Sequence, residues 1–317
     1  MLPRLIACGF SIAMMVPAVL QAAEPYPSKP IRLLASQPGA QVDFVARRLS
    51  QGLADSLGQP VVVDNRPGYI SVEVASNAQP DGYTLVIYAS SVWISVFLRK
   101  QPFDPVKDLA PITLPTNAPL FLFIHPSLPV KSVQELIAYA KARPGVLNYG
   151  SSAIGTSNHL AGVLFKKMSG VDIVRVPYKG TGAAAIGLMS NQVQMMFAAA
   201  LAGMPMVKAG RLRVLGVASK QRSQVAPEVP TISESGLPGY EAAALTVMWA
   251  PARTPAAIVN RLSKEVLRVL NSAEVKTQLL RAGLEPIGTT PEETASYMKA
   301  DMAKWSKLIK EGAVRED

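Results

Sequence analysis

The chain has 317 residues, 49% of them apolar, and a formal net charge of +10 at pH 7. This length predicts two domains with sizeable cores. The basic residues are scattered among acidic ones, which argues against nucleic acid as a partner, while the positive balance favours anionic ligands. One cysteine, Cys8, and two histidines, His125 and His159, exclude disulfides and cysteine- or histidine-rich metal sites, so no metal is expected.

The N-terminus has the pattern of a secretory signal peptide. Arg4 is followed by an apolar run over residues 5–20, which is too short for a comfortable membrane span. Cleavage after Ala23 is imperfect because Gln21 stands where a small residue is preferred. We predict that residues 1–23 are removed and that the mature chain is exported; an uncleaved membrane anchor is the alternative.

Short β-branched runs alternate with amphipathic helices along the mature chain, a pattern that predicts an α/β fold. Strands are predicted at residues 30–36, 61–65, 83–89, 146–150, 173–178 and 211–219. Helices are predicted at residues 42–58, 69–78, 132–145, 156–168, 255–271 and 291–310, the third with a capping box from Ser132 to Glu135. The apolar segments 119–126 and 240–251 could each carry the chain between the two domains.

Residues 149–159 read YGSSAIGTSNH and lie between a predicted strand and a predicted helix. The free amides and positive dipole end of that helix favour a bound carboxylate, and Gly155 would allow its close approach. A serine hydrolase using Ser152 and His159 is an alternative, but Ile154 replaces the second glycine of a nucleophile elbow. The hydroxyls expected to add donors are those of Ser151, Ser152 and Thr156, unless Thr156 or Ser157 only caps the helix.

Two further junctions have the same character. Residues 35–43 place Gly39 in a turn before a helix whose first turn contains Asp43, which complements the helix dipole. Residues 178–185 match G-x-G-x-x-A but lack the later acid that a dinucleotide site needs, so no nucleotide cofactor is expected. Junctions from two domains would hold a ligand in an interdomain cleft. Trp93 follows the end of the third strand and is a candidate to line it.

The chain resembles the periplasmic solute receptors of the tripartite tricarboxylate transporter family, the Bug or TctC-like group, in the order and spacing of PIRLLASQPGAQVDFVARRLS, AQPDGYTLVI, FDPVKDLAPIT and VLNYGSSAIGTSNHLAGVLF. The resemblance implies a type II periplasmic-binding-protein fold, with two α/β lobes joined by crossing strands and a ligand cleft between them. Lobe I is expected at residues 24–120 plus 248–317, and lobe II at residues 121–247.

The resemblance also implies a non-enzymatic periplasmic receptor that delivers a small carboxylate to membrane transporter subunits. The ligand would be a dicarboxylate, tricarboxylate, acidic amino acid or aromatic acid, and the receptor a monomer. A ligand-sensing protein for a membrane signalling partner would have the same fold. The residues expected to bind the ligand are Gln37, Pro38, Gly39, Ala40, Tyr69, Ser90, Trp93, Ser151, Ser152, Gly155, Thr156, His159, Lys179 and Gly180. The chain departs from the family pattern at Gln37, Ala40, Tyr69, Leu245 and Val247, which is expected to reshape the specificity pocket.

Overall fold

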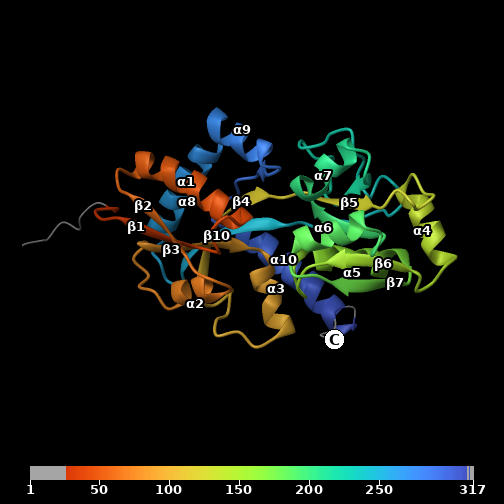
Figure 1. Ribbon diagram of the computed structural model, residues 1–317. Helices are drawn as coiled ribbons and strands as arrows, with labels where there is room; N and C mark the ends of the chain where they lie inside the picture. The colour runs from red at the N-terminus through yellow and green to blue at the C-terminus, as the bar shows by residue number, and fades with distance from the viewer. Residues whose placement is uncertain (1–25, 313, 315–317) are drawn as a thin grey trace, which may run out of the picture.

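The structure is a computed structural model that describes residues 26–312 and residue 314 (Figure 1). The predicted signal peptide, residues 1–23, lies outside the described residues. Within the described part, no helix is both long and apolar enough to cross a lipid bilayer. Two mixed β-sheets with helices on their faces confirm the predicted α/β class.

The first sheet has six strands in the order β11–β4–β10–β3–β1–β2. Strands β1 to β3 run parallel, whereas β10 runs antiparallel to both β3 and β4. The strand bounds are Ile31–Ala35 (β1), Val61–Asn65 (β2), Thr84–Ala89 (β3), Leu109–Asn117 (β4), Leu245–Pro251 (β10) and Glu285–Pro286 (β11). Alternate side chains point to opposite faces, so Leu33 joins one hydrophobic cluster and its neighbour Leu34 joins another.

Helices cover both faces of this sheet. The Leu33 side packs against α1 (Gln41–Leu57) and α8 (Ala256–Leu270). The Leu34 side packs against α2 (Ile70–Ser76), α3 (Ser91–Leu98) and α10 (Pro291–Lys310), while α9 (Ala273–Arg281) lies at the edge near β11. Helix α1 ends at Gly58 as its sequence predicts, because that residue takes the left-handed conformation at φ 70°.

The second sheet has five strands in the order β7–β6–β8–β5–β9, with β5 antiparallel to its neighbours. The strand bounds are Leu120–Ile124 (β5), Leu147–Ser151 (β6), Ile173–Pro177 (β7), Met195–Ala199 (β8) and Arg213–Val217 (β9). Helices α4 (Val133–Lys141) and α5 (Ser157–Ser169) cover one face. Helices α6 (Thr181–Met189) and α7 (Ala200–Lys208) cover the other.

The chain passes between the sheets in two neighbouring segments. It leaves the first sheet after β4 and enters the second at β5, and it returns between β9 and β10. The outgoing Ala118 amide donates to the Ala244 carbonyl of the returning segment (3.0 Å). The crossing is therefore shorter than the predicted segments 119–126 and 240–251, because β5 and β10 each lie within one sheet.

The C-terminal helix α10 also reaches both parts of the molecule. Asp301 of α10 accepts a hydrogen bond from the indole Nε1 of Trp93 in α3 (2.8 Å). Just beyond the helix, Glu311 forms an ion pair with Lys167 of α5 (2.9 Å). Figure 1 shows α10 running from the centre of the molecule to a C-terminus beneath α5. Helix α10 thus joins helices that cover different sheets.

Some elements differ from the sequence prediction. Helix α4 ends at Lys141, before the predicted end at residue 145, because the Pro144–Gly145 turn follows it. Its capping box is only half formed, since the Glu135 carboxylate accepts from the Lys131 amide while Ser132 Oγ accepts from the Glu135 amide. The sequence does not predict α3, β4, β8, α7 and α9, whose apolar runs or short lengths show no clear period.

Candidate functional site

A cleft of about 810 Å³ lies at the carboxyl ends of several parallel strands. Gly39 follows β1, Ala89 ends β3, Ser152 follows β6 and Ala199 ends β8, and all four residues line the cleft. Ligands of open α/β sheets bind at this edge, and the volume is typical of small-molecule sites. Because the lining comes from both sheets, the cleft is the principal candidate for a binding site.

Four helix N-termini open onto this cleft, and in none of them does the N-cap residue make a side-chain cap hydrogen bond. They belong to α1, α5, α6 and α7. Elsewhere, the N-termini of α4, α9 and α10 are capped by Ser132, Ser272 and Thr290, whereas those of α2, α3 and α8 also lack a side-chain cap. An uncapped helix end presents first-turn amides without intrahelical partners and about half a positive charge. The four ends therefore make the cleft attractive to an anion.

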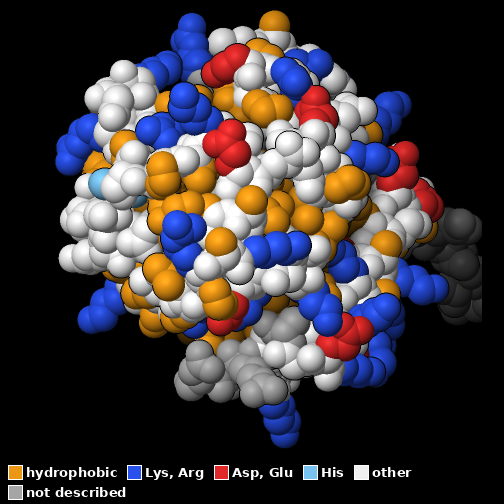
Figure 2. Space-filling model, turned by 90° about the vertical axis from the view of Figure 1, so that its right-hand side faces the viewer, with side chains coloured by type: hydrophobic (Ala, Val, Ile, Leu, Met, Phe, Trp, Pro, Cys, Tyr) orange, Lys and Arg blue, Asp and Glu red, His pale blue; other side chains and the backbone are white. Residues whose placement is uncertain are grey.

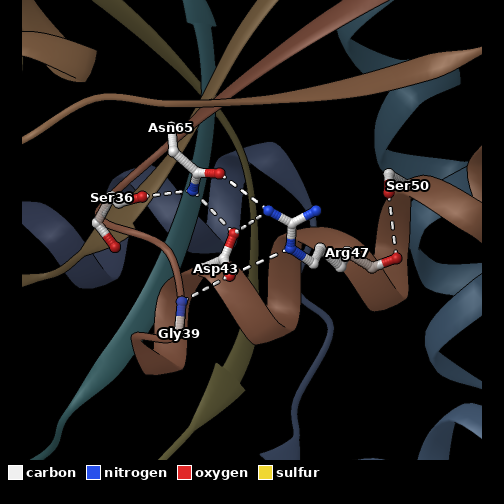
Figure 3. Close-up of polar contacts among 6 residues, drawn as sticks. All are labelled: Ser36, Gly39, Asp43, Arg47, Ser50 and Asn65. Atoms are coloured by element: carbon white, nitrogen blue, oxygen red, sulfur yellow. Dashed lines mark hydrogen bonds and ion pairs between the residues drawn. The ribbon is translucent and has the colours of Figure 1, made fainter.

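The loop before α1 is held by the carboxylate of Asp43 (Figure 3). Its Oδ2 accepts from the Gly39 amide (2.9 Å) and from Arg47 Nε (3.2 Å), and its Oδ1 accepts from Asn65 Nδ2 (2.8 Å). Asn65 Nδ2 also donates to the Ser36 carbonyl (2.6 Å), which ties the loop to the end of β2. The expected role of Gly39 as a ligand donor is thus not supported, because its amide already serves Asp43.

Asp43 remains ionised in this network. Burial acts to raise its pKa, but the hydrogen bonds from Arg47, Gly39 and Asn65 outweigh burial and hold the pKa below its usual value. Arg47 also forms an ion pair with Oδ1 (3.0 Å). This pairing offsets a negative charge that would otherwise oppose an anion at the α1 N-terminus. The amides of Gln41 and Val42, which line the cleft, are the donors that α1 offers.

The loop before α5 is organised by a neutral residue, Asn158. Its Oδ1 accepts from Ser152 Oγ (2.8 Å), from Thr156 Oγ1 (2.6 Å) and from the His159 amide (2.9 Å). A backbone amide can only donate, so this contact fixes which end of the Asn158 side chain is oxygen. Asn158 lines the cleft and is only 6% exposed, and its buried Nδ2 has no partner within the described residues. Such a group costs about 1–3 kcal/mol until a partner arrives.

The hydroxyls and the glycine of this loop have internal roles. Ser152 and Thr156 line the cleft, but the single proton of each hydroxyl is shared among internal acceptors, which are Asn158 Oδ1, the other hydroxyl (3.0 Å) and, for Thr156, the Ala153 carbonyl (2.6 Å). The Gly155 amide donates to His159 Nδ1 (3.1 Å). A Cβ on Gly155 would lie 2.5 Å from the Leu98 side chain of α3. The lack of a side chain at Gly155 therefore permits packing against α3, not the expected approach of a ligand.

The predicted alternative of a Ser152–His159 pair finds no support in this geometry. The Ser152 hydroxyl is directed to Asn158 and Thr156, whereas the His159 ring accepts the Gly155 amide and is buried. His159 borders a different pocket from the cleft. A nucleophile and its base need a mutual hydrogen bond, so these residues are placed to shape the loop.

Ser151 lies behind the loop and is fully buried. Its Oγ accepts from Arg175 Nε (2.8 Å), and Arg175 Nη2 donates to the Ser152 carbonyl (2.8 Å). Arg175 lies on β7 and was not expected from the sequence as part of the site. It fixes the loop that carries Ser152, and it borders a different pocket from the cleft.

Other predicted site residues lie away from the cleft. Tyr69 packs against Tyr88 with a ring distance of 5.5 Å and borders a small pocket of about 190 Å³. Ser90 borders a second small pocket. Trp93 is fully buried and donates to Asp301, whose pKa is raised by burial. Trp93 is a packing residue in this structure because α10 covers it.

The remaining predicted residues flank the cleft. Gln37 and Pro38 are exposed on the same loop as Gly39, and Lys179 is exposed beside Gly180, the residue before α6. Of the predicted residues, those that line the cleft are Gly39, Ala40, Ser152 and Thr156. The lining residues that the sequence analysis missed include Gln41, Val42, Phe44, Ser157, Asn158, Thr181 and Leu201. Most lie in the first helical turn after a recognised loop, which is the signal that could have found them.

Charge is absent from the lining and dispersed over the surface. None of the residues that line the cleft is Lys, Arg, His, Asp or Glu. On the face drawn in Figure 2, Lys and Arg side chains are interspersed with acidic and hydrophobic ones and are not gathered into a block. The attraction for an anion inside the cleft therefore comes from helix ends and amide groups.

Comparison with known proteins assigns the family. The model of the tripartite tricarboxylate transporter family receptor matches residues 45–314. The chain belongs to this receptor family. BugT of Bordetella pertussis is 35% identical over 97% of this chain and 97% of its own length. This receptor is thus a solute-binding protein of a transport family, as its sequence predicts.

Solved structures of relatives share the fold of this receptor. Rpa4515 of R. palustris with adipate is 34% identical with a TM-score of 0.78, covering 91% of this chain and 99% of that one. MatC of Rhodopseudomonas palustris with bound malate is 28% identical with a TM-score of 0.74, covering 90% of this chain and 100% of that one. The expected fold of two α/β lobes joined by crossing strands around a cleft is confirmed.

Proposed function

We propose that this chain is an extracytoplasmic receptor that binds a small organic carboxylate in its cleft and delivers it to membrane transporter subunits of the tripartite tricarboxylate type. The observation that carries the proposal is the meeting of four uncapped helix N-termini on a cleft without charged side chains. Helix ends of this kind bind carboxylates and phosphates. The adipate and malate bound by two relatives support a carboxylate.

The groups proposed to hold the carboxylate come from both lobes. Gln41 and Val42 of α1 offer first-turn amides on one side, and Ser157 and Asn158 of α5 offer them on the other. The unpartnered Nδ2 of Asn158 adds a side-chain donor. A ligand that contacts both lobes binds the closed form better, so it drives closure. We retain residues 24–120 plus 248–317 and 121–247 as the proposed lobes.

The proposed receptor acts in the periplasm as a monomer and without catalysis. Export rests on the predicted signal peptide at residues 1–23, and the periplasmic-binding relatives support the location. A receptor role needs no nucleophile, in keeping with the separate contacts of Ser152 and His159. The cleft of about 810 Å³ is formed by the chain's own two sheets, so a second copy is not needed to complete it.

A thermal-shift screen of the mature protein tests this proposal, because a ligand that binds only the native state raises its melting temperature. The panel comprises adipate, hexanoate, malate and citrate, with adipamide as the neutral control. We expect at least one acid to stabilise the protein, and calorimetry to show adipamide weaker than adipate by about 2–3 kcal/mol, or roughly 30- to 150-fold. Equal binding of acid and amide would refute the cleft as an anion site. Hydrolysis of an adipate ester would refute the non-enzymatic role.

A further inference from the structure

We propose that the cleft selects acids whose carbon body is an unsubstituted hydrocarbon, in preference to acids that carry hydroxyl groups. The inference rests on the proposed function, since it assumes that a carboxylate is the anchored group. It concerns the part of the cleft that the anchored group does not fill. The observation that supports the inference is that polar and apolar side chains occupy separate parts of the cleft lining.

The polar side chains of the lining are confined to three loops and helix ends. These are the starts of α1, α5 and α6, and their polar residues are Gln41, Ser152, Thr156, Ser157, Asn158 and Thr181. Several of these groups already bond one another, as the contacts of Ser152 and Thr156 with Asn158 show. A single anionic group placed between α1 and α5 would occupy the first-turn amides of both helices, while Gln41, Ser157 and Thr181 supply further side-chain donors on this side.

The rest of the lining is apolar and comes from both sheets. Its large side chains are Val42, Phe44, Leu120, Leu201, Leu245 and Leu284, with alanines between them. The backbone at the crossing offers little to a polar ligand, because the Ala244 carbonyl accepts from Ala118 and the Leu245 carbonyl accepts from Ser90. A ligand hydroxyl that lies against these apolar side chains, out of reach of the first-turn amides of α7, would lose water without gaining a partner, which costs about 1–3 kcal/mol in proteins. Each such hydroxyl is thus strongly disfavoured.

The side chain of Leu201 is an exposed apolar part of the cleft wall. It lies in the first turn of α7, lines the cleft and is 63% exposed, which is unusual for a leucine at a cavity wall. A Cβ built on Gly283 would lie 3.5 Å from Leu201 Cγ, so Leu201 stands beside the loop that follows α9. A hydrocarbon body would bury this side chain and gain the hydrophobic free energy of doing so.

Helix α7 also brings first-turn amides to this apolar side. The proposal therefore allows a ligand with a second carboxylate, such as adipate, and one without it, such as hexanoate. The test therefore uses two matched pairs that differ only in hydroxyl groups. Adipate is compared with galactarate, its tetrahydroxy counterpart, and hexanoate with gluconate, its pentahydroxy counterpart. By calorimetry we expect the hydrocarbon acid of each pair to bind at least about tenfold more tightly, given the cost of each unpaired hydroxyl.

A pair of variants tests whether the apolar side chains of the cleft cause the preference for hydrocarbon acids. Leu201→Ser should weaken adipate and hexanoate by about three- to tenfold, because it removes apolar area from the wall. Ile186→Ser is the control, since Ile186 is 64% exposed on α6 and does not line the cleft. It should leave both affinities unchanged, and circular dichroism and melting temperature verify that both variants fold.

The outcomes separate the two proposals. Galactarate or gluconate binding as tightly as its hydrocarbon partner would overturn the hydrocarbon preference while leaving the carboxylate receptor intact. Leu201→Ser with unchanged affinity for adipate and hexanoate would also overturn it. Adipamide binding like adipate, or no binding by any acid, would instead overturn the proposed function.

Discussion

The two helix ends that face each other across the cleft are built from different chemistry. At α1, an ionised carboxylate, Asp43, holds the loop through Gly39, Arg47 and Asn65. At α5, a neutral amide, Asn158, holds the loop through hydroxyl groups and a backbone amide. Both ends leave first-turn amides toward the cleft. Similar donors can thus be presented by a charged network on one lobe and a neutral one on the other.

Because the two networks differ in chemistry, we expect the Asp43 network and the Asn158 network to affect different properties of the protein. Asp43 points back into its own loop, where its carboxylate accepts from Gly39, Arg47 and Asn65, so we expect it to act mainly on the stability of lobe I. Asn158 keeps a buried donor without a partner in the described residues, so we expect it to act mainly on ligand affinity. The contrast also predicts a response to acid at the α1 end, because the Asp43 carboxylate holds that loop and its pKa is lowered.

The largest expected effect is on binding, at the α5 end. Asn158→Asp replaces a donor by a carboxylate and places a negative charge beside the proposed anion. We expect affinity for the best acid of the screen to fall at least about 100-fold, or about 3 kcal/mol, by calorimetry. Asn191→Asp is the control, since Asn191 is exposed in the same sheet region and its side chain already accepts a hydrogen bond from Ser127. A loss below fivefold for Asn158→Asp would show that this residue does not face the ligand.

The next effect compares the glycines of the two loops. Gly39 and Gly155 both have a left-handed φ, of 77° and 80°, but a Cβ meets nothing within 4 Å at Gly39 and lies 2.5 Å from Leu98 at Gly155. We expect Gly39→Ala to cost about 1 kcal/mol of unfolding free energy from strain, and Gly155→Ala about 2–4 kcal/mol from strain plus overpacking. Urea unfolding measures both. Equal costs would mean that Leu98 moves aside freely.

The charged network gives a smaller effect on stability. Asp43→Asn keeps the shape of the side chain but removes the carboxylate that pairs with Arg47, which keeps its hydrogen bond to Asn65 Oδ1 (2.9 Å). We expect a loss of about 1–2 kcal/mol in unfolding free energy by urea titration. Asp55→Asn serves as the control because Asp55 is exposed on the same helix. If both variants lose the same amount, the loop before α1 does not depend on the Asp43 carboxylate.

The smallest effect is the dependence of that loss on pH. The native pKa of Asp43 is held below its usual value, so its unfolded form takes up a proton at higher pH than its native form. Its contribution is therefore full above about pH 4, the ordinary value for Asp, and declines as the pH falls through the native pKa. The difference in melting temperature between wild type and Asp43→Asn should narrow below about pH 4. A difference that grows on acidification would contradict the lowered pKa.

Much of the fold follows from the sequence because its signals are local. The helix that begins after Gly39 has a regular apolar face and a glycine stop at Gly58, and both act within a few residues. By contrast, α7 follows β8 directly in one continuous apolar run, so no change of period marks the boundary. Helix α3 is apolar on all sides because α10 covers it, and that contact joins residues about 200 positions apart, such as Trp93 and Asp301.

The sequence predicts which loops border the candidate site, but not which groups in those loops are free to donate hydrogen bonds. The sequence identifies 35–43 and 149–159 as anion-binding junctions, and both border the cleft. It cannot show that the Gly39 amide is taken by Asp43, or that the room above Gly155 is filled by Leu98, since these contacts depend on side-chain direction and on packing between distant elements. Asn158 was overlooked because polar residues in a first helical turn usually serve as caps.

The C-terminal helix has a consequence for how fast the ligand can leave. Helix α10 is fastened to α3 through Asp301, to the returning segment through the hydrogen bond from Lys304 to the Glu241 carbonyl (2.8 Å), and to α5 through the Glu311–Lys167 pair. Separating the lobes widely requires some of these contacts to break. We therefore expect the residence time of a ligand bound in the proposed site to depend on contacts of α10 that lie outside the cleft lining.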